Sequence, residues 1–312
     1  MNGAVDQSLA VNTRSILTVS LLSIAYLLLS AWVVGFKTDQ LVLVGIFNVC
    51  FYAADITRKF ILGFSVFIVY WILFDYMKAV PNYTISHVHL ADLYNFEKQL
   101  FGIKYNNQLL TPNEYWKLNS KTILDIIGGL FYLCWIPVPL GFGAYLFFKN
   151  RGQFLRFAMT FFLVNLLGFV VYYSFPAAPP WYIQEHGFVF YPNTPGSTGG
   201  LARFDNYFHI NLFHSIYQKG SNVFAAMPSL HSAYPIIVLY YGLKNKLGAA
   251  NIILATVMIG IWLTAIYTSH HYVLDVLAGI TCAIIGIILF NLILKQINPF
   301  KRFVDKYEAA IQ

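Results

Sequence analysis

Charged residues are scarce in this sequence. Aspartate, glutamate, lysine and arginine make up 11% of its 312 residues, whereas 58% are hydrophobic. A soluble domain carries about 25% charged residues, so the composition excludes an ordinary soluble protein and indicates an integral membrane protein. The net charge of +7 is typical of basic cytoplasmic loops in such a protein, and we expect no nucleic-acid partner.

Cysteine is almost as rare. Cys50, Cys134 and Cys282 each lie in an apolar run, which excludes a disulfide framework and gives no metal-binding spacing. We therefore expect neither a metal nor a cofactor. The first apolar run follows a single basic residue, Arg14, and lacks a clear cleavage site of small residues. We interpret it as a retained helix rather than a signal peptide.

Long hydrophobic runs are what the sequence does have. A helix that spans a membrane needs about 20 mostly apolar residues. The clear candidates are residues 15–36, 60–80, 122–148, 155–175, 249–269 and 272–294. Residues 41–56 and 228–243 are shorter or include polar residues. We predict an all-α polytopic membrane bundle of about eight transmembrane helices.

The connecting segments alternate in charge. If the chain crosses eight times, one side holds the N-terminus, the turns near 58, 150 and 246, and the C-terminal tail. The basic residues on that side are Arg14, Arg58, Lys59, Lys149, Arg151, Arg156, Lys244, Lys246, Lys295, Lys301, Arg302 and Lys306. This side is predicted to be cytoplasmic.

The same count defines the predicted domains. N-terminal transmembrane helices occupy 1–59, a membrane core occupies 60–294, and a cytoplasmic tail occupies 295–312. The core carries two long outer loops, 81–121 and 176–227, and loops of this length usually serve a function.

Two polar stretches interrupt the apolar pattern near the outer face. "TSHHYVLDVLAG" (268–279) contains His270, His271 and Asp275, and "AAMPSLHSAYP" contains His231. Placing an ionisable residue in a membrane span costs at least a few kcal/mol of free energy, so these residues must have a structural or functional role. His271 and Asp275 are four apart and share one helix face. The predicted topology brings His231 to the same membrane face.

This arrangement suits group transfer in two steps. Asp275 would accept a hydrogen bond from one nitrogen of His271 and raise the basicity of the other, which could attack phosphorus. His231 would protonate the leaving oxygen and then deprotonate the incoming one. The helix start at Pro228–Ser229 favours a bound phosphate. His270 either belongs to the site or makes a structural hydrogen bond.

Four motifs, in order, carry a family resemblance: "APPWYIQEHG", "GSTGGLARFD", "AAMPSLHSAYP" and "YTSHHYVLDVLAG". They resemble the type 2 phosphatidic acid phosphatase superfamily, and within it the inositol phosphorylceramide synthase branch. The resemblance implies a six-helix catalytic core preceded by N-terminal helices. It also implies that His231, His271 and Asp275 form the catalytic triad, with a histidine as nucleophile.

The sequence departs from the phosphatases of this superfamily. They place an arginine six residues before the third-motif histidine, where this chain has Ala265, and the lysine-and-arginine first motif is also missing. Another cation must then meet the phosphate. Arg203 is the best candidate because its planar fork suits phosphate oxygens, although it could instead pair with Asp205.

Four further residues have two interpretations each. Trp181 and Tyr182 would either stack on a sugar or anchor the protein at the membrane interface. Asp75 and Lys78 would either recognise a head group or pair with each other.

Within 81–121, "HLADLYNFEKQLFG" has apolar residues at helical spacing, which predicts an amphipathic helix lying in the interface.

The leading hypothesis is a membrane phosphotransferase. The resemblance implies transfer of a phospho-alcohol head group, phosphoinositol, from a glycerophospholipid donor to a ceramide-like acceptor, with release of diacylglycerol. The residues themselves do not distinguish inositol from ethanolamine, choline or glycerol. One alternative is a lipid phosphate phosphatase; the other is a non-enzymatic transporter or scramblase, which would place its ionisable residues nearer the midplane. The active site would face the periplasm in a bacterium or the Golgi lumen in a eukaryote.

Overall fold

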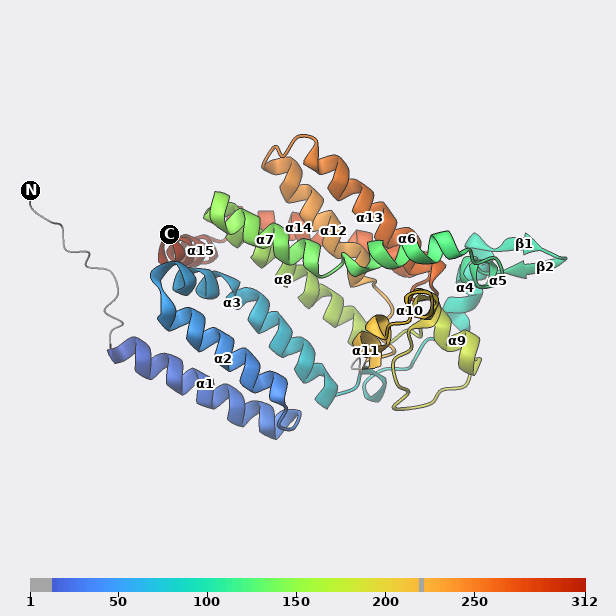
Figure 1. The fold of residues 1–312 in the computed structure, drawn as a ribbon, viewed down its shortest axis with the longest axis horizontal. Coiled ribbons are helices and arrows are strands. Elements are labelled where there is room, and N and C mark those ends of the chain that lie inside the picture. The colour runs from blue at the N-terminus through green and yellow to red at the C-terminus, as the bar shows by residue number, and fades with distance from the viewer. Residues whose placement is uncertain (1–12, 219–221) are drawn as a thin grey trace, which may run out of the picture.

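The computed structural model describes residues 13–218 and 222–312. In this part of the chain α-helices dominate, and the only strands form one short hairpin. The long helices run along the length of the molecule (Figure 1). They are α1 (Thr13–Val33), α2 (Thr38–Ala53), α3 (Asp55–Tyr76), α6 (Thr122–Leu133), α7 (Pro137–Lys149), α8 (Arg151–Ser174), α12 (Leu230–Lys244), α13 (Ala250–Tyr267) and α14 (Val273–Gln296). The predicted all-α membrane bundle is confirmed.

All eight predicted spans are helical, and six are long and apolar enough to cross a membrane among the described residues. These six are Thr13–Val33, Asp55–Ala79, Thr122–Lys149, Arg151–Ser174, Ala250–Tyr267 and Val273–Gln296. The other two, α2 and α12, have 16 and 15 residues. At 1.5 Å per residue, α12 is about 22 Å long. It packs against α8, α13 and α14, so protein surrounds it where a longer helix would meet lipid.

The span predicted at 122–148 is two helices rather than one. α6 ends at Leu133 and α7 begins at Pro137. Ile136 keeps helical backbone angles, but proline has no N–H to donate to the helix before it and fits the first turn of a new helix. Pro137 therefore ends one helix and begins the next, a break that the apolar pattern concealed.

Aromatic side chains fill the core of the bundle. Phe147 from α7 and Phe154 and Phe157 from α8 are fully buried. Polar pairs join α8 to α12 within this core: the Thr160 and Tyr241 hydroxyls lie 2.8 Å apart, and Tyr234 donates to Asn165 at 2.6 Å. A buried hydroxyl is costly unless it is paired, so these bonds fix how the two helices pack.

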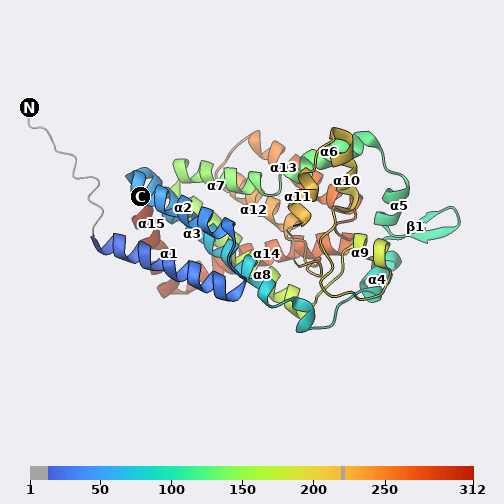
Figure 2. The same cartoon turned by 60° about the horizontal axis from the view of Figure 1, so that its bottom comes forward.

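The two predicted outer loops fold into a lobe at one end of the bundle (Figure 2). Its elements are α4 (Ala91–Phe101), β1 (Ile103–Tyr105), β2 (Gln108–Leu110), α5 (Pro112–Leu118), α9 (Pro180–His186), α10 (Ala202–Phe208) and α11 (Leu212–Gln218), with 3-10 turns at Met77–Ala79, Asn82–Thr84 and Gly199–Leu201. The predicted helix in 81–121 is present as α4. The hairpin was not predicted; Asn106 and Asn107 form its turn with φ of 46° and 63°, which asparagine tolerates better than most residues.

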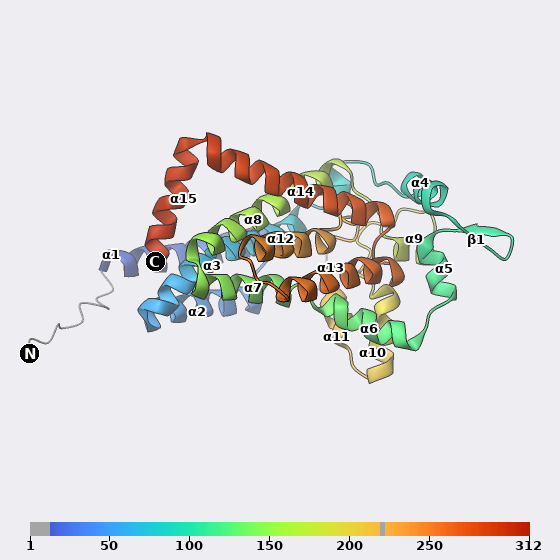
Figure 3. The same cartoon turned by 90° about the horizontal axis from the view of Figure 1, so that it is seen from above.

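The C-terminal tail is folded. After α14, α15 (Asn298–Ile311) turns back across the bundle end opposite the outer lobe (Figure 3). There it packs on α3 and α8, and the Tyr307 hydroxyl donates to the Leu62 carbonyl at 2.6 Å. The segment predicted as a simple tail is thus part of the packed structure.

Candidate active site

The two predicted catalytic histidines meet at the end of the bundle that carries the lobe formed by the described residues of 81–121 and 176–227. His231 lies in the first turn of α12, and His271 lies just before α14. His231 Nδ1 and His271 Nε2 are 3.1 Å apart, a hydrogen-bonding distance. Forty residues of sequence separate these side chains, and the α12–α13 hairpin brings them together.

A backbone hydrogen bond between the segment that contains His231 and the segment that contains His271 holds the two histidines close together. The Ser229 N–H donates to the Asp275 carbonyl at 2.9 Å, and the Ser229 side chain caps α12 by accepting from the Ser232 N–H at 3.3 Å. Gly279 makes the contact possible, because a Cβ there would lie 2.1 Å from the Ser229 carbonyl oxygen. Ser229 is therefore engaged within the protein, which corrects the expectation that it is presented to a phosphate.

Asp275 lies beside His271, and the pair is loosely engaged. The Asp275 carboxylate is fully buried, and its Oδ2 is 3.6 Å from His271 Nδ1. That distance is too long for a hydrogen bond. His271 Nδ1 and Asp275 Oδ1 have no hydrogen-bond partner among the described residues. Catalytic hydrogen bonds are often long without substrate and tighten when it binds, so a separation of 3.6 Å is compatible with catalytic pairing of the two side chains.

The backbone of the histidine turn is clamped. The His270 and His271 N–H groups both donate to the Ala265 carbonyl at 3.0 Å. The buried amide of Asn113, from α5, donates to the carbonyls of Ile266 and His271 at 2.7 and 2.9 Å. The outer lobe thus positions His271, a role of Asn113 that sequence reasoning missed. Asn113 belongs to no motif, so the sequence offered no signal for it.

Tyr132 is a second site residue that sequence reasoning missed. Its hydroxyl lies 3.2 Å from His231 Nδ1, and the side chain is fully buried. Trp135 packs its ring edge against the His231 ring at 4.3 Å between centroids. Both residues lie at the end of α6 and the break after it. The proline that causes this break was the one available signal.

His270 lies beside the histidine pair. Its Nδ1 is 3.0 Å from the Thr268 hydroxyl, and its ring lies between those of Tyr132 and Tyr217. The buried Nε2 has no partner among the described residues. The structural hydrogen bond considered from the sequence is present, and one polar atom stays unsatisfied.

Arg203 does not pair with Asp205. Its Nε donates to Asp125 of α6 at 2.6 Å, and the guanidinium lies over the Tyr267 ring. Asp205 instead accepts the N–H groups of Phe213 and His214 at 3.2 and 3.0 Å, at the start of α11. One terminal nitrogen of Arg203 is buried without a partner among the described residues. Arg203 is thus anchored through its Nε, and a terminal nitrogen of its guanidinium can still donate a hydrogen bond.

Trp181 and Tyr182 are core side chains of the outer lobe. They are 5% and 0% exposed and pack with Val88 and Phe224. The Tyr182 hydroxyl donates to the Val189 carbonyl at 2.9 Å and accepts the Tyr191 N–H at 2.8 Å. With both rings buried, the interface-anchoring interpretation is wrong, and no free ring face is offered to a sugar.

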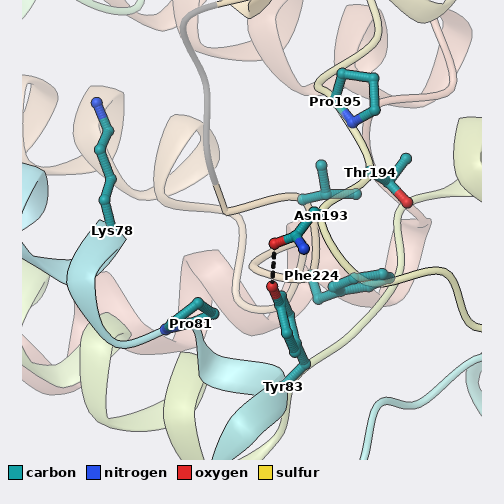
Figure 4. Close-up of a pocket in the computed structure, with 8 residues that line it drawn as sticks. Lys78, Pro81, Tyr83, Asn193, Thr194, Pro195 and Phe224 are labelled. Carbon is teal, nitrogen blue, oxygen red and sulfur yellow. Dashed lines mark hydrogen bonds between the residues drawn. The ribbon is translucent and has the colours of Figure 1, made fainter.

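Lys78 lies apart from the histidines. It pairs with Asp75 at 2.9 Å, as one sequence interpretation held. It also lines an outer pocket of about 260 Å³ with Tyr83 and Asn193, which are hydrogen-bonded to each other (Figure 4). The described residues that line this pocket include none of the predicted triad.

The arrangement can perform two-step group transfer. One imidazole has a carboxylate behind it, and a second imidazole faces it with a tyrosine hydroxyl at its edge. Among the described residues, no group of three histidine, cysteine, aspartate or glutamate side chains forms a metal site. The two imidazoles offer a nucleophile and a separate proton carrier.

Comparison with known proteins adds four findings. The family model of the PAP2 superfamily matches residues 108–289, more than half of the chain. A phosphoinositol dihydroceramide synthase of Bacteroides thetaiotaomicron is 44% identical over 96% of this chain and 99% of its own length. An inositol phosphorylceramide synthase of Candida albicans is 28% identical over 75% of this chain, which matches 48% of that protein. No solved structure matches the chain.

Proposed function

Because this chain belongs to the PAP2 superfamily, we propose that it is a membrane phosphotransferase that makes phosphoinositol ceramides. The donor is phosphatidylinositol, the acceptor is dihydroceramide or a similar ceramide, and the second product is diacylglycerol. One observation carries the proposal: the chain that matches a phosphoinositol dihydroceramide synthase from end to end also holds His231 and His271 3.1 Å apart.

In the first proposed step, His271 Nε2 attacks the phosphorus of phosphatidylinositol. The bond from phosphorus to the diacylglycerol oxygen breaks, and His231 gives that oxygen a proton. Phosphoinositol is then bound to His271, whose Nδ1–H donates to Asp275 and so stabilises the charged ring. A phosphate entering the site must part the two rings, because reacting atoms need about 3–3.5 Å between them.

In the second proposed step, the primary hydroxyl of the ceramide attacks the same phosphorus. His231, now neutral, takes the hydroxyl proton, the bond between phosphorus and nitrogen breaks, and His271 is regenerated. Proton and charge balance at the end of the cycle. Arg203 is proposed to meet the phosphodiester, since its anchored guanidinium has an unsatisfied nitrogen and arginine suits phosphate oxygens.

We further propose that the site faces the non-cytoplasmic side. The short turns and the C-terminal segment at the opposite end of the bundle are rich in lysine and arginine, as cytoplasmic segments are.

The test is a reaction of the purified protein with labelled phosphatidylinositol, with and without dihydroceramide. We expect release of diacylglycerol that depends on dihydroceramide, and little phosphate from phosphatidic acid. A single-charged phosphodiester needs fewer cations than a free phosphate dianion, and this chain lacks the extra basic residues of the superfamily's phosphatases. Rapid hydrolysis of phosphatidic acid with no effect of ceramide would favour the phosphatase instead.

A further inference from the structure

At the start of α14, the N–H groups of Val273 and Leu274 are capped from outside the helix. Its cap position is Tyr272, which cannot accept the N–H groups of the first turn as serine, threonine or asparagine would. Glu97, 176 residues earlier in α4, takes that place. Its two carboxylate oxygens accept the N–H groups of Val273 and Leu274 at 2.9 and 3.1 Å, and its side chain is fully buried.

Glu97 shares this helix start with Asp275. Asp275 Oδ2 accepts the Tyr272 N–H at 2.8 Å, while its Oδ1 has no partner among the described residues. A carboxylate that accepts several N–H groups becomes a weaker base. Because Glu97 occupies two of the first-turn N–H groups, Asp275 accepts only the Tyr272 N–H, through Oδ2, the oxygen 3.6 Å from His271 Nδ1, and its Oδ1 has no partner among the described residues.

A simple helix cap would not need this arrangement. A serine or asparagine at position 272 would cap α14 without burying an ionisable group. Burial raises the pKa of Glu97 to about 7; the N–H groups of Val273 and Leu274 lower it, and the nearby charge of Asp275 raises it. The titratable side chains that interact electrostatically with Glu97 are Asp275 and Tyr272. The protein thus places a second, costly carboxylate beside the first.

We propose that Glu97 is a positioning residue for phosphoryl transfer: it occupies the first-turn N–H groups of α14 and so reserves Asp275 for His271. The inference rests on the proposed function, in which His271 is the nucleophile. Glu97 lies outside residues 108–289, which the family model matches, so it extends the site into α4. Glu97 is four residues after Leu93, and the two form the buried face of α4.

The test compares Glu97→Gln with wild-type protein, using the full chain, phosphatidylinositol and dihydroceramide. We expect kcat to fall roughly ten-fold with KM unchanged, a loss typical of partners that orient a functional histidine. The acid side of the pH profile should move to lower pH. In the variant, the glutamine amide keeps one acceptor oxygen, so one of the two N–H groups is vacated. Asp275 is free to accept it and then stabilises protonated His271 less, so His271 loses its proton at lower pH. Glu97→Asp, which keeps the charge, should keep the wild-type pH profile.

Asp205→Asn is the matched control. Asp205 is also a buried carboxylate that accepts two N–H groups at a helix start, but α11 carries no triad residue. We expect it to lower the thermal unfolding temperature as Glu97→Gln does, without moving the pH profile. If Glu97→Gln lowers stability yet leaves kcat and the pH profile unchanged, Glu97 is only a helix cap and the inference is overturned. If Glu97→Gln does not fold, the pH profile of Glu97→Asp decides instead. A shift of its acid side relative to wild-type protein then overturns the inference.

Failure of the proposed function would look different. Wild-type protein that hydrolyses phosphatidic acid and transfers nothing to dihydroceramide overturns the transferase. The same pH profiles, measured for that hydrolysis, would still decide the role of Glu97, since the two histidines would act there as well.

Discussion

At the scale of single residues, substitutions can distinguish the proposed roles of the two histidines, His271 as nucleophile and His231 as proton donor and acceptor. His271→Ala removes the proposed nucleophile, and we expect no transfer at all. His231→Ala should slow both the formation and the breakdown of the phosphoinositol–His271 intermediate, because His231 serves both steps. Trapping labelled phosphoinositol on the protein during single turnovers measures the two rates. A His271→Ala protein that still became labelled would show that another residue is the nucleophile.

The role of Asp275 can be tested with the isosteric Asp275→Asn. An asparagine amide can present its NH2 donor to His271 Nδ1. This would favour the tautomer with the proton on Nε2, whose Nε2 cannot attack phosphorus. In the serine protease triad the same change costs about 10⁴ in kcat, and we expect a loss in that direction here. Turnover at the wild-type rate would mean that Asp275 serves only to hold the Tyr272 N–H.

Arg203 can be judged by two substitutions. Arg203→Ala should reduce kcat/KM roughly 100-fold, the usual cost of removing a donor that stabilises developing negative charge. Arg203→Lys should restore only part of this, because lysine lacks the planar fork. Kinetics with phosphatidylinositol measure both. Near-normal rates in Arg203→Ala would leave Arg203 as a structural partner of Asp125.

At the scale of elements, the site depends on how closely α12 and α14 approach. Gly279→Ala places a methyl group 2.1 Å from the Ser229 carbonyl oxygen, so the helices must separate. Overpacking of this kind costs about 1–3 kcal/mol, and transfer should fall with it because His231 and His271 move apart. Thermal unfolding and the transfer rate are measured together.

Gly141→Ala in α7 is the control for this change. Nothing lies within 4 Å of a Cβ added there, and alanine stabilises a helix interior by roughly 0.5–1 kcal/mol relative to glycine. We expect equal or higher stability and unchanged transfer. If Gly279→Ala behaved like Gly141→Ala, the contact between the two motifs would not be what holds the histidines together.

At the scale of the whole molecule, orientation in the membrane decides which lipid leaflet supplies the substrates. We expect Val189→Cys, at an exposed position of the outer lobe, to react with an impermeant maleimide in right-side-out vesicles. Lys301→Cys in α15 should react only after permeabilisation. The three native cysteines are first replaced by alanine in both proteins. The opposite pattern would place the site on the cytoplasmic face.

Much of this architecture followed from the sequence alone. Apolar runs of sufficient length dictate helices in a membrane, because every backbone polar group must be paired within the chain. The alternating basic turns predicted which ends lie together, and with them that His231 and His271 share one end. The helix break at Pro137 was missed because Cys134–Ile136 is as apolar as the flanking helices.

Only the tertiary structure decided the contacts that join distant segments. His271 and Asp275 could be paired from the sequence because the spacing of four residues is a local property of a helix. Asn113 and Tyr132 reach the histidines from other elements, and Glu97 reaches the start of α14. Nothing in their own neighbourhoods indicates a partner more than 90 residues away. Local periodicity determines which residues share a helix face, whereas side-chain packing between helices determines which faces meet.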